Sequence, residues 1–114
     1  MTEAVLNHHL EAFDSGNVET ILSDYAPDAL LLTPTGTLHG HAQIRPVLQS
    51  LLKDIFQSAT QFTMLQQIVE GELAYIVWSA ESDRYRVPLA TDTYLIRGGK
   101  IVIQTFTAQM EAKA

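Results

Sequence analysis

The hydrophobic pattern of this chain changes its period near the middle, and that change limits the folds open to it. As far as Phe56, apolar residues recur at the spacing of amphipathic helices. From Gln61 onward the sequence is rich in β-branched and aromatic residues and is divided by turn signals such as Gly71-Glu72 and Gly98-Gly99. Strands joined by short turns run antiparallel. The sequence therefore predicts an α+β fold in which helices come first and a meandering antiparallel sheet covers them.

The first half of the chain predicts three helices and one short strand. Residues 2–15 place an apolar stripe opposite charged side chains, and Gly16 with Asn17 ends this helix and caps the next. Inside a helix Pro46 would clash with the carbonyl four residues earlier, so regular helix is expected to begin only near Arg45, with Pro46 in its first turn. The predicted helices are 2–15, Val18–Tyr25 and His41–Phe56, and the predicted strands are Ala29–Thr33, Gln61–Glu70, Leu73–Glu81, Val87–Arg97 and Lys100–Gln109.

Size and charge exclude several classes of function. A chain of 114 residues is long enough for one core, which predicts a single domain over residues 1–114. Thirteen acidic against seven basic residues give a net charge of −6, which repels nucleic acids and anionic membranes, so neither is expected as a partner. The absence of cysteine excludes disulfides and thiolate chemistry. The amino-terminal residues lack the features of a secretory signal, and we expect a cytoplasmic protein.

Two titratable side chains stand out against apolar surroundings. His9 lies in the middle of the apolar stripe of residues 2–15, and Asp92 is the only charge in a strand-like segment before Arg97. A buried carboxylate has to be paired, hydrogen-bonded or protonated. His9 is either a structural histidine satisfied by a neighbour or a functional group, and Asp92 either faces an interior cleft or is a solvated charge on the outer face.

Other chemical motifs are weak or missing. His39-Gly40-His41 offers two imidazoles, but no acidic residue lies close to them in the sequence, and a turn before a helix often carries polar residues. The sequence has no G-x-S-x-G elbow and no phosphate-binding loop. We therefore expect no metal site and no cofactor.

Several short strings follow one another in an informative order. They are Phe13-Asp14-Ser15-Gly16-Asn17, Tyr25-Ala26-Pro27-Asp28-Ala29, Pro34-x-Gly36, His39-Gly40-His41-x-x-Ile44 and Asp92-x-x-x-Ile96 before Gly99-Lys100-Ile101. This order resembles the nuclear transport factor 2-like superfamily, in particular its SnoaL-like polyketide cyclase and ketosteroid isomerase branch. The resemblance implies a cone-shaped, strongly curved antiparallel sheet wrapped around three helices, an apolar central cavity, and a homodimer formed through the outer face of the sheet.

The resemblance also implies roles for single residues. His9 falls near an oxyanion-binding position, Asp92 resembles a pocket-facing strand carboxyl, and Thr33 falls near the position of a general-base aspartate. A hydroxyl cannot abstract a proton from carbon unaided, so Thr33 argues against ketosteroid isomerisation by that mechanism. The residues expected to line the cavity are Phe13, Tyr25, Thr33, Tyr75, Val77, Ser79, Tyr94, Gln104 and Phe106, and those expected to face a dimer partner are Ile76, Trp78, Thr93, Leu95 and Thr105.

Two hypotheses of function follow. In the first, His9 and Asp92 meet in the cavity, directly or through one water, and act as an acid–base pair for an isomerisation, cyclisation, dehydration or hydration of a small, mostly apolar molecule. In the second, the chain is a non-catalytic ligand-binding or dimerisation module in which the pair satisfies itself. The fold alone does not separate them.

Overall fold

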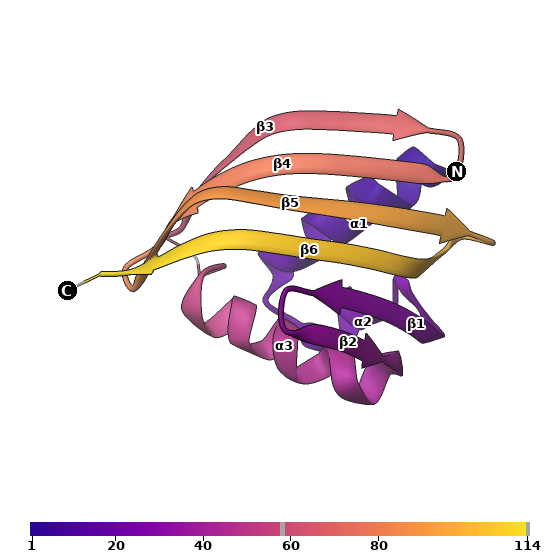
Figure 1. The fold of residues 1–114 in the computed structure, drawn as a ribbon, viewed down its shortest axis with the longest axis horizontal. Helices are drawn as coiled ribbons and strands as arrows, with labels where there is room; N and C mark the ends of the chain where they lie inside the picture. Colours follow the sequence, from indigo (N-terminus) through magenta and orange to yellow (C-terminus); the bar gives the residue numbers. More distant parts are fainter. Residues whose placement is uncertain (58, 114) are drawn as a thin grey trace.

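The computed structural model describes residues 1–57 and 59–113 of the chain. It contains three helices, α1 (Thr2–Ser15), α2 (Val18–Leu22) and α3 (Gly40–Asp54), and a six-stranded sheet. The strands are β1 (Tyr25–Thr33), β2 (Gly36–His39), β3 (Gln61–Glu70), β4 (Leu73–Glu81), β5 (Tyr85–Arg97) and β6 (Lys100–Ala112). Figure 1 shows the long strands bending across the molecule, with the helices gathered on one side of them. The predicted α+β class and the curved sheet are confirmed.

The sheet is antiparallel except at one pairing. Its strand order is β2-β1-β6-β5-β4-β3. β3 to β6 form the predicted meander, and β1 pairs with β6 in parallel while β2 folds back on β1. The helices pack on the concave face, where α1 contacts β4 and β5 and α3 contacts β1. No helix among the described residues combines the length and hydrophobicity needed to cross a bilayer.

The early boundaries differ from the predicted ones. α2 ends at Leu22 and not at Tyr25, and β1 begins at Tyr25 and not at Ala29. The shift in register between Tyr25 and Leu30 lets the strand pass Pro27, which sequence reasoning took as a break before the strand. The sequence does not predict β2, because Gly36–His39 is short and lies directly beside the turn residues Pro34-Thr35-Gly36.

α3 is regular from Gly40, earlier than the predicted start near Arg45. Pro46 lies inside it. Pro46 has no N–H to donate to the Ala42 carbonyl. Both residues are exposed, so water can hydrogen-bond that carbonyl instead. The carboxyl-terminal end is Asp54 rather than Phe56.

The predicted facing of β4 is wrong. Ile76 and Trp78 are buried on the concave face, with exposed fractions of 2% and 3%, whereas Tyr75 is 37% exposed on the convex face. The register explains this, because Ile76 lies directly opposite Asp92 and residues opposite each other in a sheet share a face. An inward Asp92 therefore requires an inward Ile76, and alternation then places Tyr75, Val77 and Ser79 outside.

Candidate active site

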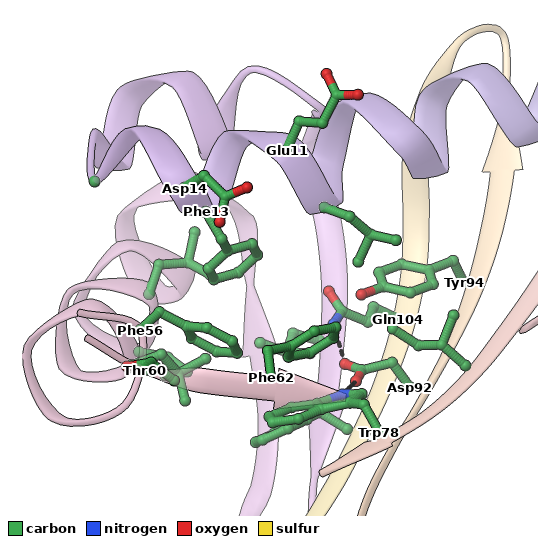
Figure 2. A pocket seen from close by; sticks show the side chains of 18 of the residues that line it. Glu11, Phe13, Asp14, Phe56, Thr60, Phe62, Trp78, Asp92, Tyr94 and Gln104 are labelled. Carbon is green, nitrogen blue, oxygen red and sulfur yellow. Dashed lines mark hydrogen bonds between the residues drawn. The ribbon is translucent and has the colours of Figure 1, made fainter. Parts of the chain in front are cut away.

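A cavity of about 820 Å³ lies between the helices and the concave face of the sheet. Its walls come from α1, β1, α3, the segment after α3, and the inner positions of β3 to β6 (Figure 2). Five of the residues predicted to line a cavity do so, namely Phe13, Tyr25, Tyr94, Gln104 and Phe106. The curved sheet thus encloses a volume suited to a small molecule.

Aromatic rings form one wall of this cavity. Phe56 and Phe62 lie 5.4 and 5.5 Å from Trp78, measured between ring centroids, and Phe106 stacks on Trp78 at 6.5 Å. Phe13 reaches the same group through Phe56 at 5.0 Å. Such a wall favours flat or alicyclic apolar ligands over polar ones.

Asp92 brings a carboxyl group into this apolar wall. Trp78 Nε1–H donates to Oδ2 at 2.8 Å and Gln104 Nε2–H donates to Oδ1 at 2.7 Å (Figure 2). Burial raises the pKa of Asp92 from its ordinary value of 3.8 to about 6, although the hydrogen bonds from Trp78 and Gln104 lower it. A carboxyl that titrates near neutrality inside a cavity is suited to acid–base catalysis.

His9 lies behind the cavity wall and not in it. Its ring is 1% exposed and makes edge contacts with Phe13, Tyr25 and Tyr94. Nδ1 lies 3.3 Å from Asp24 Oδ2, and Nε2 lies 3.4 Å from the Tyr25 hydroxyl. The histidine is therefore held on both sides by polar partners.

The predicted meeting of His9 and Asp92, directly or through one water, is wrong. They are the ends of a longer chain, because the Tyr25 hydroxyl next to His9 donates to Gln104 Oε1 at 2.5 Å, and Gln104 in turn donates to Asp92. Two side chains, Tyr25 and Gln104, separate the two groups. The sequence placed His9 and Asp92 in the interior but could not show what fills the distance between them.

Asp24 is the partner of His9 that sequence reasoning missed. It is 8% exposed and bridges His9 and His8, whose Nδ1 lies 2.7 Å from Asp24 Oδ1. The predicted extension of α2 to Tyr25 concealed it, since Asp24 then read as a helix residue. The adjacent pair His8-His9 in the sequence was the available signal for a shared carboxylate.

Four predicted lining residues lie elsewhere. Tyr75, Val77 and Ser79 are on the convex face of β4. The Thr33 hydroxyl donates to the Gly36 carbonyl at 2.9 Å and so belongs to the turn between β1 and β2. None of the four is among the residues that line the cavity.

Two further hydroxyl groups and two carboxylates shape the cavity. Burial, followed by the charge of Asp92, raises the pKa of Tyr25 and of Tyr94 well above 10, so both stay neutral hydrogen-bond donors. Figure 2 shows the Tyr94 hydroxyl directed toward the interior. Glu11 and Asp14 line the cavity from α1 and are exposed, which makes its rim acidic.

Within His39-Gly40-His41, one imidazole and one backbone N–H have partners in the fold. His41 Nε2 lies 3.0 Å from the Tyr25 carbonyl, and the His39 backbone N–H donates to the Gln43 side chain at the start of α3. Within residues 1–57 and 59–113, no three histidine or carboxylate side chains come together as metal ligands would.

A curved, mostly antiparallel sheet packed against three helices is the architecture of the nuclear transport factor 2-like class of folds. The chain belongs to the SnoaL-like domain family, which matches residues 6–104. No curated protein matches it by sequence.

Solved structures with the same fold share little sequence with this chain. A SnoaL-like protein from Burkholderia thailandensis has a TM-score of 0.74 at 15% identity, covering 95% of this chain and 94% of that one. A ketosteroid isomerase-like protein from Kribbella flavida has a TM-score of 0.76 at 16% identity, covering 99% and 80%. TerC, co-crystallised with polyporic acid, has a TM-score of 0.73 at 17% identity, covering 95% and 91%. At these identities the likeness shows the fold alone.

Proposed function

We propose that this protein is a cofactor-independent enzyme that performs acid–base chemistry on a small, mostly apolar molecule. The reaction class is isomerisation, cyclisation, dehydration or hydration. The observation that carries the proposal is Asp92, an ionisable carboxyl set in the wall of an apolar cavity, with its pKa raised to about 6. Family membership and the isomerase-like relative from Kribbella flavida support it.

The hydrogen bonds to Asp92 leave it free to react. Each carboxylate oxygen accepts one bond, from Trp78 or from Gln104, and keeps a second lone pair for a ligand. As a carboxylate, Asp92 accepts a proton from a carbon next to a carbonyl or from an attacking water. As the resulting acid, it returns that proton to another atom of the same substrate.

Tyr94 is the proposed partner of Asp92 in the reaction. Its neutral hydroxyl faces the cavity and can donate a hydrogen bond to an oxygen on which charge develops. His9 acts only indirectly in this proposal, because Tyr25 and Gln104 stand between it and Asp92. Thr33 takes no part, so we do not propose ketosteroid isomerisation with a base at that position.

The substrate we propose is neutral and cyclic. The aromatic wall around Trp78 favours a flat or alicyclic body, and the acidic rim formed by Glu11 and Asp14 disfavours an anion. The volume of about 820 Å³ lies within about 300–1,000 Å³, the usual range for small-ligand sites. TerC shows that this fold can be crystallised with a small organic molecule.

A second function, ligand binding without catalysis, is favoured by one observation. Every buried side-chain nitrogen and oxygen in residues 1–57 and 59–113 has a hydrogen-bond partner, and both oxygens of Asp92 are bonded without any substrate. A non-catalytic carrier with the same cavity would need nothing more.

Deuterium exchange separates the two functions. Neutral cyclic ketones, including any molecule that mass spectrometry finds bound to the purified protein, are incubated with it in D₂O, and exchange next to the carbonyl is followed by NMR. We expect exchange with the unaltered protein and with Asp28→Asn, a change on the exposed outside of β1, but a loss of at least about 100-fold with Asp92→Asn. Equal rates for all three, or binding without exchange, would favour the carrier.

We also propose a homodimer formed through the convex face. Leu73, Leu95 and Ile103 lie opposite one another across β4, β5 and β6, and Leu73 and Ile103 are 49% and 37% exposed. A row of this kind on a sheet is typical of an interface. The net charge of −6 supports the expectation of no nucleic-acid or membrane partner, and a cytoplasmic location stays part of the proposal.

A further inference from the structure

The side chains between His9 and Asp92 form a single hydrogen-bonded chain with a definite direction. Asp92 as a carboxylate can only accept, so Gln104 must turn its amide nitrogen toward it, as observed. Gln104 Oε1 then takes the single hydroxyl proton of Tyr25, whose oxygen can only accept from His9. The distances agree with this direction, since Tyr25 lies 2.5 Å from Gln104 and 3.4 Å from His9.

His9 lies at the other end of this hydrogen-bonded chain of side chains. His9 Nδ1 faces the carboxylate of Asp24, which accepts a proton, and His9 Nε2 faces a Tyr25 oxygen that has no proton to give. All atoms are satisfied when His9 carries a proton on both nitrogens. Asp24 also contacts the exposed His8, so this end of the chain reaches the protein surface.

A second arrangement satisfies the same atoms equally well. If Asp92 is protonated, its O–H donates to Gln104 Oε1 after the amide has rotated by about 180°. Gln104 Nε2–H then donates to the Tyr25 oxygen, and the Tyr25 hydroxyl donates to an unprotonated His9 Nε2. Between the two arrangements His9 Nε2 loses one proton and Asp92 gains one, and either can exchange with solvent.

We propose that Gln104 is a positioning residue whose amide orientation couples the protonation of Asp92 in the cavity to that of His9 behind it, through Tyr25. The two arrangements hold the same number of protons, so what occupies the cavity sets their ratio. A ligand that donates a hydrogen bond to the Asp92 carboxylate favours the first arrangement, because in the second arrangement one oxygen of Asp92 carries a proton that is already donated to Gln104. This inference deepens the proposed function, and its relevance to catalysis rests on the proposed role of Asp92.

Three titratable side chains face His9 from the elements packed against it. Asp24 and Tyr25 face His9 from the start of the sheet, and Tyr94 faces it from β5. Tyr25 and Tyr94 both stay neutral hydroxyls because burial raises the pKa of each. The groups that change charge in the coupling are therefore His9 and Asp92.

Nuclear magnetic resonance on the whole protein, labelled with ¹⁵N in histidine and glutamine, tests this coupling at about pH 8, where Asp92 is ionised. Asp92→Asn presents an amide N–H where the protonated acid would present its O–H. We expect His9 Nε2 to carry a proton in the unaltered protein and to lose it in Asp92→Asn. The Gln104 amide protons should move from a contact with the Trp78 indole N–H to a contact with the Tyr25 ring.

Asp14→Asn is the matched control, since it removes the same charge from the cavity rim without touching the chain. It should leave the His9 Nε2 proton in place, and in a Gln104→Met background Asp92→Asn should no longer affect His9. A His9 Nε2 proton retained in Asp92→Asn, an equal loss in Asp14→Asn, or an unmoved Gln104 amide would each overturn the coupling. The contacts of the Gln104 amide test the coupling even if the Gln104→Met protein does not fold.

The readout needs no substrate. Failure of the coupling would therefore leave the proposed chemistry of Asp92 intact, and failure of the deuterium-exchange assay would leave the coupling intact.

Discussion

The two faces of the sheet are built from alternating residues of the same strands, yet they do different work. On the concave face, Trp78 and Asp92 are almost fully buried, and each polar atom of the pair has a defined partner. On the convex face, Tyr75 and Leu73 are 37% and 49% exposed and lie among threonines and aliphatic side chains. Burial with hydrogen bonding therefore marks the proposed reaction site, whereas apolar exposure marks the proposed contact with a second copy.

The largest expected effect on stability comes from two positions on opposite faces of β4. Trp78→Ala removes a ring that packs against Phe56, Phe62 and Phe106, and we expect it to lower the free energy of unfolding by about 3–5 kcal/mol. Tyr75→Ala, on the convex face, should cost about 1 kcal/mol in the monomer. Urea unfolding of both variants measures this. Equal costs would mean that the two faces are not distinguished as described.

The effect of Asp92→Asn on stability should depend on pH. The folded-state pKa of about 6 lies above the ordinary 3.8, so this carboxyl favours folding when protonated, and its contribution is lost as the pH rises through about 6. Because about two pH units correspond to about 3 kcal/mol, Asp92→Asn should stabilise the protein by up to that amount near pH 8 and change little near pH 4.

The measurement is the melting temperature of both proteins across that pH range. Asp28→Asn, on an exposed carboxylate, is the control and should change stability by less than about 0.5 kcal/mol at either pH. Destabilisation by Asp92→Asn at high pH would show that the carboxylate charge itself holds the fold together.

The convex face gives the smallest expected change in stability and a clear change in assembly. Leu95→Lys places a charge in the centre of the row formed with Leu73 and Ile103, so the dimer should dissociate while the monomer loses about 1 kcal/mol or less. Sedimentation velocity at micromolar concentration follows this, with Ala42→Lys on the exposed side of α3 as the control. A monomeric starting protein, or a dimer that survives Leu95→Lys, contradicts the proposed interface.

The sequence predicted the class of fold and the later strands well because their signals are local. The boundaries Gln61–Glu70 and Leu73–Glu81 agree with β3 and β4, since turn residues and β-branched runs mark them directly. The predicted first strand is too short, because β1 continues through Pro27 by means of an irregular pairing with β6. That pairing is a long-range feature. The short β2 depends on the same kind of pairing.

The site was predicted in its parts but not in its connections. His9 and Asp92 stood out as polar residues in apolar segments, and both are buried. The facing of Ile76 depends on the register between β4 and β5, and the partnership of His9 with Asp24 depends on how α1 meets the start of β1. Neither relation can be predicted from a single sequence, because each is fixed by packing between distant segments.

The titration of the Asp92 carboxyl is the most direct test of the central claim, that a poised acid–base group lies in an apolar cavity. Carbon-13 NMR of the aspartate side chains can follow it in the whole protein, with the Trp78 indole N–H as a second reporter of the same group. We predict a midpoint near 6, with the Trp78 signal moving at the same pH. A midpoint at or below the ordinary 3.8, or a Trp78 signal that does not follow it, would contradict the account.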